Sequence, residues 1–238
     1  MVIIERLNSP VAYWWFENEN EPIDRRTTPS DLRELLEMCQ SVAEVLESYE
    51  LLRPNMVILT DWIDPNSDNK YILNEEAAVA VPIPAQAGAC QIVALCEETL
   101  SQLDATRKGS FLYPTTIDIL GTGVVINSAG HKYEFPNVTW LSGTGGSRPA
   151  VDVNTQIDAW LPYTLLAEPQ PEVCNYNRPR LEAALREIQS QLGIVPVTEE
   201  HNKYVLVNGL HLANYMDDDE PMVVVHQARS PWYRNVLL

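Results

Sequence analysis

Short β-rich runs alternate with stretches of helical periodicity, and this alternation constrains the fold most. The runs Val11–Phe16 and Met56–Trp62 are rich in β-branched and aromatic residues, as strands are. Between them, apolar residues recur every three or four positions, which predicts a helix that begins at Thr28-Pro29 and ends before Arg53-Pro54. The order of strand, helix and strand indicates a fold that contains both kinds of element.

The rest of the chain continues this pattern. We expect a strand at Ala77–Ile83, a helix over about 86–105, and a third helix that starts at Asn175 or Asn177 and stops at Gly193. Short strands in the middle are separated by turn signals, which favours an antiparallel meander. Further turns and strands are expected at Gly121-Thr122-Gly123, in the loop 143–147, at Ile157–Leu166 and in a hairpin about Asn208-Gly209. The prediction is an α+β fold, with a mixed, largely antiparallel sheet or sheets and three main helices packed on them.

The segment Glu168-Pro169-Gln170-Pro171 is the best candidate for a linker. It divides the chain into an N-terminal α/β subdomain, residues 1–166, and a C-terminal helix-hairpin subdomain, residues 167–238, which we expect to pack as one globular unit. Three strand–helix–strand blocks follow one another near 11–62, 77–120 and 157–207, without residue-level identity, so whether they are a true repeat stays open.

The charge balance restricts the partners. Sixteen Lys and Arg face 33 Asp and Glu, a formal net charge of −17, which repels nucleic-acid backbones and anionic membranes and attracts cationic proteins. The alternative is that the acidic surface only maintains solubility. No apolar run approaches the ~18 residues of a membrane span, no leader opens the chain, and the four cysteines form no C-x-x-C pair, so we expect a cytoplasmic protein without membrane or nucleic-acid partners.

Signatures of metal, nucleotide or catalytic sites are weak. Asp64, Asn66, Asp68 and Glu75 have the spacing of a calcium loop, but the central glycine is missing, and Asx-rich turns have the same composition. The glycine loops lack the phosphate-binding pattern, the four histidines are scattered, and there is no G-x-S-x-G. We therefore expect no cofactor, no metal and no enzymatic activity.

Two acidic surfaces are the candidate binding sites. Glu37, Glu44 and Glu47 lie opposite the apolar stripe of the first predicted helix, where neighbouring like charges cost about 0.2–0.5 kcal/mol per pair. An uncompensated cost of this kind hints at a cationic partner. The second acidic surface is Asp217, Asp218, Asp219 and Glu220, on the edge of a hairpin or loop.

The C-terminal third of the chain resembles the ends of immunity proteins from bacterial polymorphic-toxin systems. The resemblance lies in the helix Asn177-Arg178-Pro179-Arg180-Leu181-Glu182, the strand Tyr204–Val207 and the acidic turn Asp217–Glu220. It implies a non-enzymatic antidote that binds a cognate toxin and occludes its active site, and it carries over no catalytic residue. The resemblance and the charge together predict a protein that masks a toxin or another basic protein in bacterial competition. Two alternatives remain, a small cytosolic hydrolase that uses scattered His and acidic residues, and a structural accessory protein of a phage or secretion system. The oligomeric state is open.

Overall fold

The computed structural model describes residues 2–5, 10–17, 29–63, 78–106, 113–145, 148–198, 205–223 and 234–237. The helices in these ranges are α1 (Pro29–Ser48), α2 (Ile92–Thr106) and α3 (Pro171–Leu192), and a 3-10 helix, η1 (Ala89–Gln91), leads into α2. The main sheet consists of β2 (Ala12–Glu17), β3 (Arg53–Ile63), β4 (Val79–Pro82), β5 (Tyr113–Ile126), β6 (Lys132–Pro136), β7 (Thr139–Thr144) and β8 (Ala150–Thr155). Three small pairs complete the described structure: β1 (Val2–Glu5) with β13 (Arg234–Leu237), β9 (Val205–Asn208) with β10 (His211–Asn214), and β11 (Met216–Asp217) with β12 (Glu220–Pro221).

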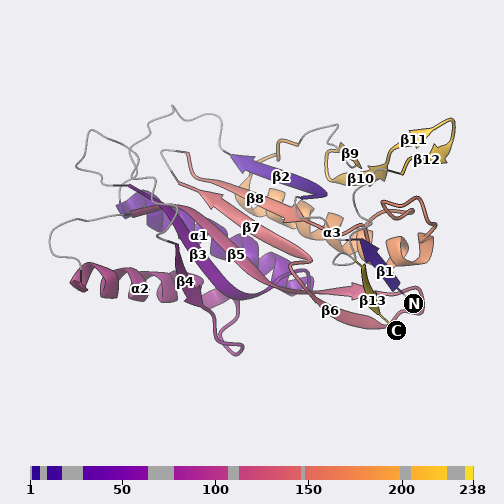
Figure 1. Ribbon diagram of the computed structural model, residues 1–238. Helices are drawn as coiled ribbons and strands as arrows, with labels where there is room; N and C mark the ends of the chain where they lie inside the picture. Colours follow the sequence, from indigo (N-terminus) through magenta and orange to yellow (C-terminus); the bar gives the residue numbers. More distant parts are fainter. Residues whose placement is uncertain are drawn as a thin grey trace.

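The seven-stranded sheet has the order β2-β8-β7-β5-β3-β4, and β6 pairs with the second half of β5. Every described pairing of these strands is antiparallel. The predicted α+β class is thus confirmed: three helices accompany a mostly antiparallel sheet (Figure 1).

One face of the sheet is the core face. The register places Trp14, Val153, Leu141, Ile119, Val57 and Val81 in a row across six strands, and all six side chains are buried. Helix α1 covers this face with the stripe that the sequence predicts, Leu32, Leu35, Leu36, Cys39, Val42, Ala43 and Leu46. Helix α3 packs beside α1 and also contacts β5, and in the view of Figure 1 both helices lie behind the strands.

The expectation of a turn at Gly121-Thr122-Gly123 is wrong, because β5 runs straight through it. The glycines are needed for close packing of the backbone. A Cβ at Gly121 would lie 2.1 Å from the carbonyl oxygen of Arg53, and one at Gly123 would lie 2.2 Å from that of Leu51. The chain between α1 and β3 therefore passes directly against β5, at a distance that only glycine permits.

The predicted strand at Ile157–Leu166 is also wrong. The strand in this region is β8, which ends at Thr155, and the following residues form turns. Asp158 holds these turns together, since its buried Oδ2 accepts a hydrogen bond from the N–H of Leu165 at 2.9 Å. The loop expected over 143–147 begins later than predicted, because Gly143 and Thr144 belong to β7.

The proposed linker is part of the packed structure. Gln170 is buried, and its Nε2 donates to the carbonyl oxygens of Asp158 at 2.7 Å and Leu161 at 3.1 Å. Helix α3 begins at Pro171, earlier than expected, and stops as predicted at Gly193, whose φ is 68°. Buried residues of α3 and of the sheet belong to one core cluster. The division into subdomains at residue 166 stays a prediction.

The hairpin near Asn208 forms one position later than predicted. Asn208 pairs with His211, so the two turn residues are Gly209 and Leu210. The hairpin is tied to the core by Trp14, whose indole N–H donates to the carbonyl oxygen of Gly209 at 2.9 Å, across 195 positions of the sequence.

Candidate functional site

The face of the main sheet opposite α1 carries a row of polar and aromatic residues. Trp15 on β2 pairs with Asp152 on β8, Asp152 with Ser142 on β7, and Ser142 with Asp118 on β5. Paired residues of antiparallel strands point to the same side, so these four side chains share one face. All four are half-buried, and none of the described helices covers them. We call this the open face.

Asp152 is the unusual member of the row. Its Oδ1 is buried and has no hydrogen-bond partner in the described structure. Loss of hydration raises the pKa of Asp152 from 3.8 to about 7, because burial disfavours the charged form. A buried carboxylate oxygen without a donor is rare in folded proteins, where nearly all buried polar atoms are paired.

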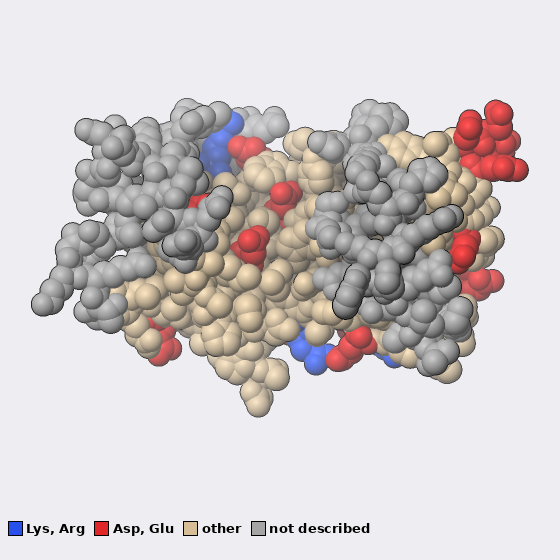
Figure 2. All heavy atoms as spheres, in the orientation of Figure 1, with Lys and Arg blue, Asp and Glu red and all other residues tan. Residues whose placement is uncertain are grey.

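Asp118 lies two strands from Asp152, a Cα separation of about 9.5 Å at the usual strand spacing. Burial raises the pKa of Asp118, the hydrogen bond with Ser142 opposes the rise, and the negative charge of Asp61 adds to it. Figure 2 shows this side of the molecule, where separate acidic side chains lie across the middle of the described surface.

Trp15 is fixed at the rim of the row. Its indole N–H donates to Oε2 of Glu17 at 2.9 Å, and its backbone exchanges two hydrogen bonds with Val197 at 3.0 and 2.8 Å. The predicted strand Val11–Phe16 therefore does send alternate rings to opposite faces. Trp14 and Phe16 are buried in the core, while Tyr13 and Trp15 lie on the open face.

The three glutamates that the sequence proposed on the first helix all have contacts within the chain. Glu37 pairs with Arg33 at 2.9 Å, and Glu44 accepts a hydrogen bond from Gln40 at 3.0 Å. Glu47 accepts one from the backbone N–H of Ala89 at 3.0 Å. Only Glu37 gains a counter-charge, while Glu44 and Glu47 accept hydrogen bonds from neutral groups. These contacts within the chain weaken the argument that first pointed to this helix face; its role in partner binding stays untested.

The second predicted surface, Asp217–Glu220, is solvent-exposed: Asp217 ends β11, Glu220 begins β12, and Asp218 and Asp219 form the two-residue turn between them. Asp218 and Asp219 have φ values of 47° and 67°. Positive φ is unfavourable for residues other than glycine, but Asp and Asn adopt it more readily than most. None of the four carboxylates forms an ion pair with another described residue. The open face and this turn are separate features of the surface.

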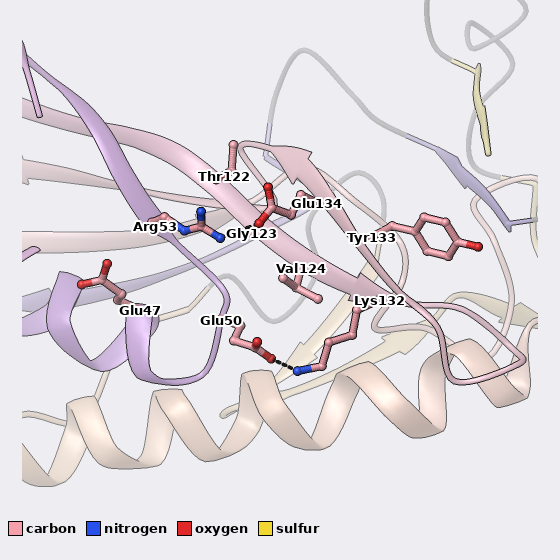
Figure 3. Close-up of a pocket in the computed structure, with 9 residues that line it drawn as sticks. All are labelled: Glu47, Glu50, Arg53, Thr122, Gly123, Val124, Lys132, Tyr133 and Glu134. Carbon is pink, nitrogen blue, oxygen red and sulfur yellow. Dashed lines mark hydrogen bonds and ion pairs between the residues drawn. The ribbon is translucent and has the colours of Figure 1, made fainter. Parts of the chain in front are cut away.

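A pocket of about 300 Å³ opens beside the end of α1 (Figure 3). Four of its charged groups form two ion pairs, Glu50 with Lys132 and Arg53 with Glu134, while Glu47 accepts a hydrogen bond from the backbone N–H of Ala89. The hydrogen bond from Lys132 lowers the pKa of Glu50. Exposed pairs of this kind add little stability. Both cations that line the pocket are engaged in these pairs, so we assign no function to the pocket.

Two polar residues of α3, the helix that carries the resemblance to immunity proteins, form hydrogen bonds within the fold. Asn177 is buried and bonds both the N–H and the C=O of Ile126, at 2.9 and 2.7 Å. Arg180 donates to the carbonyl oxygens of Tyr49 at 2.7 Å and Val124 at 3.0 Å. These side chains tie α3 to β5 and to the end of α1.

The remaining sequence candidates add no site. Asp64, Asn66, Asp68 and Glu75 lie outside the described residues, as do His201 and His226. His131 and His211 are exposed, and His211 contacts Glu182. Within the described ranges no three metal-ligating side chains come together, and no helix has the length and hydrophobicity of a membrane span.

Comparison of the chain with protein-family models, curated proteins and solved structures found no match. The resemblance to immunity proteins stays a prediction. Sequence reasoning missed Asp152 as a site residue because it placed no strand at Ala150–Thr155; the alternation of Val151 and Val153 with polar residues was the available signal.

Proposed function

We propose that the protein is a non-enzymatic binding protein of the immunity type, which docks on a toxin or another basic protein and masks its active site. The observation that carries this proposal is the open face, where Asp118 and Asp152 lie without an ion pair to any described residue. A half-buried carboxylate without a counter-charge has lost part of its hydration, which is unfavourable in free energy. A cationic partner that pairs with the carboxylate offsets this loss.

The chemistry of the open face suits protein recognition. Aromatic side chains such as Trp15 bury a large area at low entropic cost and commonly dominate binding energy. The net charge of −17 speeds association with a basic partner by about 10–10³ at low salt. The exposed turn Asp217–Glu220 contributes to this attraction without needing to touch the partner.

The proposal includes action in the cytoplasm. In the structure the four cysteines are free and three of them are buried, a state that persists in a reducing compartment.

The test is to isolate the partner and rebuild the complex. The tagged protein is used to retain partners from its native host at low salt, and each retained protein is then produced separately and mixed with the purified chain. We expect a 1:1 complex with one basic protein, whose association rate falls steeply with salt and whose activity is blocked. No stoichiometric complex with a basic protein, or a complex that leaves its activity intact, would overturn the proposal.

Hydrolysis is a second candidate, because a carboxyl group with a pKa of about 7 is suited to general acid catalysis at neutral pH. Most glycoside hydrolases use a pair of catalytic carboxylic acids in one active site, and the open face carries two carboxyl groups. A panel of p-nitrophenyl glycosides and esters tests this. Turnover that is lost in Asp152→Asn and kept in Asp104→Asn, on the exposed side of α2, would favour the enzyme.

A further inference from the structure

Asp152 presents an unused acceptor on the open face. Its Oδ1 is buried without a donor, whereas Asp118, in the same row, already has the hydroxyl of Ser142. On β7 the neighbour of Asp152 is the uncharged Ser142, and on β2 it is Trp15. The strands that flank Asp152 therefore supply no cation to it.

The surroundings of Asp152 restrict the ligand. A metal ion requires several ligands at one point, and no such group exists among the described residues. Arg148 lies in the β7–β8 loop, and although its Nε is also buried without a partner, it forms no ion pair with Asp152. A cation with N–H donors that pairs with Asp152 would therefore come from outside the described residues.

Trp15 selects among such cations. Trp15 is the cross-strand partner of Asp152, so its side chain projects from the same face. The hydrogen bond to Glu17 holds the indole in place. A planar guanidinium group stacks on an aromatic ring and donates two parallel hydrogen bonds to one carboxylate. An ammonium group is a strongly hydrated point charge and does neither of these as well.

We infer that Asp152 and Trp15 form the seat for one arginine side chain of the basic partner, with Asp118 adding electrostatic attraction from the same row. This inference rests on the proposed function and names the group on the partner that the open face recognises. Binding is coupled to a proton: at neutral pH a fraction of Asp152 is protonated, and the incoming cation favours the ionised form. The charged residues nearest in register, Glu17 and Asp118, are acidic and do not compete for the guanidinium.

The probe is an octapeptide of alternating glycine and arginine, added to the full chain. Two matched peptides carry lysine or citrulline in place of arginine; citrulline keeps the shape and removes the charge. The readouts are the NMR signals of the Trp15 indole N–H and the Asp152 carboxyl carbon, and calorimetry in buffers of different ionisation enthalpy. The variants are Asp152→Asn and Asp104→Asn, each of which replaces one carboxyl group by an amide.

We expect the arginine peptide to shift both signals and to release protons at pH 7. Asp152→Asn should weaken binding at least fivefold, and Asp104→Asn less than twofold, with circular dichroism showing both variants folded. Equal affinity for the lysine peptide, or equal affinity of the two variants, would overturn the arginine seat. Binding of the citrulline peptide with the affinity of the arginine peptide would do so as well.

Failure of this inference and failure of the proposed function are distinguishable. If a basic partner is found whose complex is insensitive to Asp152→Asn, the arginine seat is wrong and the masking function stands. If the arginine peptide binds as described but no basic protein forms a stoichiometric complex, the seat stands and the masking function is wrong.

Discussion

Glu47 on α1 accepts a hydrogen bond from the backbone N–H of Ala89, the first residue of η1, at 3.0 Å. Gln40, two turns earlier on α1, accepts one from the N–H of Val93 at 3.1 Å. The first turns of a helix leave N–H groups without partners inside the helix. The polar side of α1 therefore caps the η1–α2 segment, which explains why a glutamate near other glutamates is tolerated there.

This cap predicts different costs for two glutamates on the same helix. Glu47→Ala should lower the free energy of unfolding by about 1 kcal/mol, as loss of a cap does. Glu44→Ala, which loses only an exposed hydrogen bond to Gln40, should change it by less than ~0.5 kcal/mol. Urea unfolding measures both. Equal effects would show that the contact with Ala89 does not stabilise the protein.

Gly143 on β7 packs against Cys39 on α1. A Cβ at this position would lie 2.5 Å from Sγ of Cys39, so Gly143→Ala should destabilise the protein by about 1–3 kcal/mol. Gly145→Ala is the control, because its Cβ would meet nothing closer than 3.4 Å. The double variant Gly143→Ala/Cys39→Ala removes the clash and should be more stable than the sum of the single changes predicts. Thermal unfolding of the four variants measures these stability changes. If the effects of the two single substitutions simply add in the double variant, the packing argument is wrong.

Arg180 joins three elements by bonding backbone carbonyl oxygens, and burial lowers its pKa. Arg180→Ala leaves those carbonyl oxygens without a donor, so we expect a loss of about 2–4 kcal/mol in stability. Arg186→Ala, on the exposed side of α3 and paired only with Glu182, should cost less than ~1 kcal/mol. Lysine keeps the positive charge but cannot donate in the same planar geometry. The loss of stability in Arg180→Lys should therefore lie between the losses in Arg180→Ala and Arg186→Ala. Similar midpoints for the Arg180→Ala and Arg186→Ala variants in urea would refute the anchoring role.

Asp152 makes stability depend on pH. Its pKa is 3.8 in the unfolded chain and about 7 in the fold, so the folded state holds a proton that the unfolded state has lost, and stability falls as pH rises between these values. Asp152→Asn removes the penalty. At pH 8 the variant should be more stable by on the order of 1–2 kcal/mol, a discounted figure because the carboxylate keeps part of its hydration.

Asp152→Asn and the control Asp104→Asn together define the pH range in which Asp152 affects stability. Near pH 4 the wild-type carboxyl is protonated in the folded state and still partly protonated in the unfolded state, whose pKa of 3.8 lies just below this pH. The stability difference between the variant and the wild type should therefore be close to its low-pH limit. Asp104→Asn, at an exposed position of α2, is the control for replacing a carboxyl group by an amide. Chemical unfolding at one-unit steps from pH 4 to 8 measures the difference, and a flat difference across this range would mean that Asp152 is ionised normally.

The acidic turn between β11 and β12 retains strained residues. Asn-Gly is the preferred pair for a two-residue turn with positive φ at both positions, so Asp218→Asn/Asp219→Gly should stabilise the hairpin. We expect about three- to fivefold slower hydrogen exchange of the Met222 amide, which bonds the carbonyl oxygen of Tyr215 at 2.8 Å. Asp217→Asn/Glu220→Gln removes the same charge without relaxing the turn and is the control. Equal exchange in the two variants would assign the effect to charge instead of backbone strain.

The sequence alone determined the elements whose periodicity is unambiguous. The apolar stripe from Leu32 to Leu46 predicted α1, and the β-branched run after Met56 predicted β3, because each pattern has one dominant spacing. The excess of carboxylates was readable directly. Boundaries set by proline and glycine were less certain: Gly193 does end α3, whereas Pro171 starts a helix that the sequence placed later.

Only the tertiary structure decided which polar side chains have hydrogen-bond partners within the fold and which do not. Glycines that predict turns became strand positions because the backbone of Arg53 and Leu51 approaches them, a contact between distant segments that no local pattern encodes. Glu47 and Arg180 found intramolecular partners, while Asp152 did not. The reason is that a side chain's hydration and its partners depend on strand register, and a shift of one residue turns each side chain of a strand to the other face.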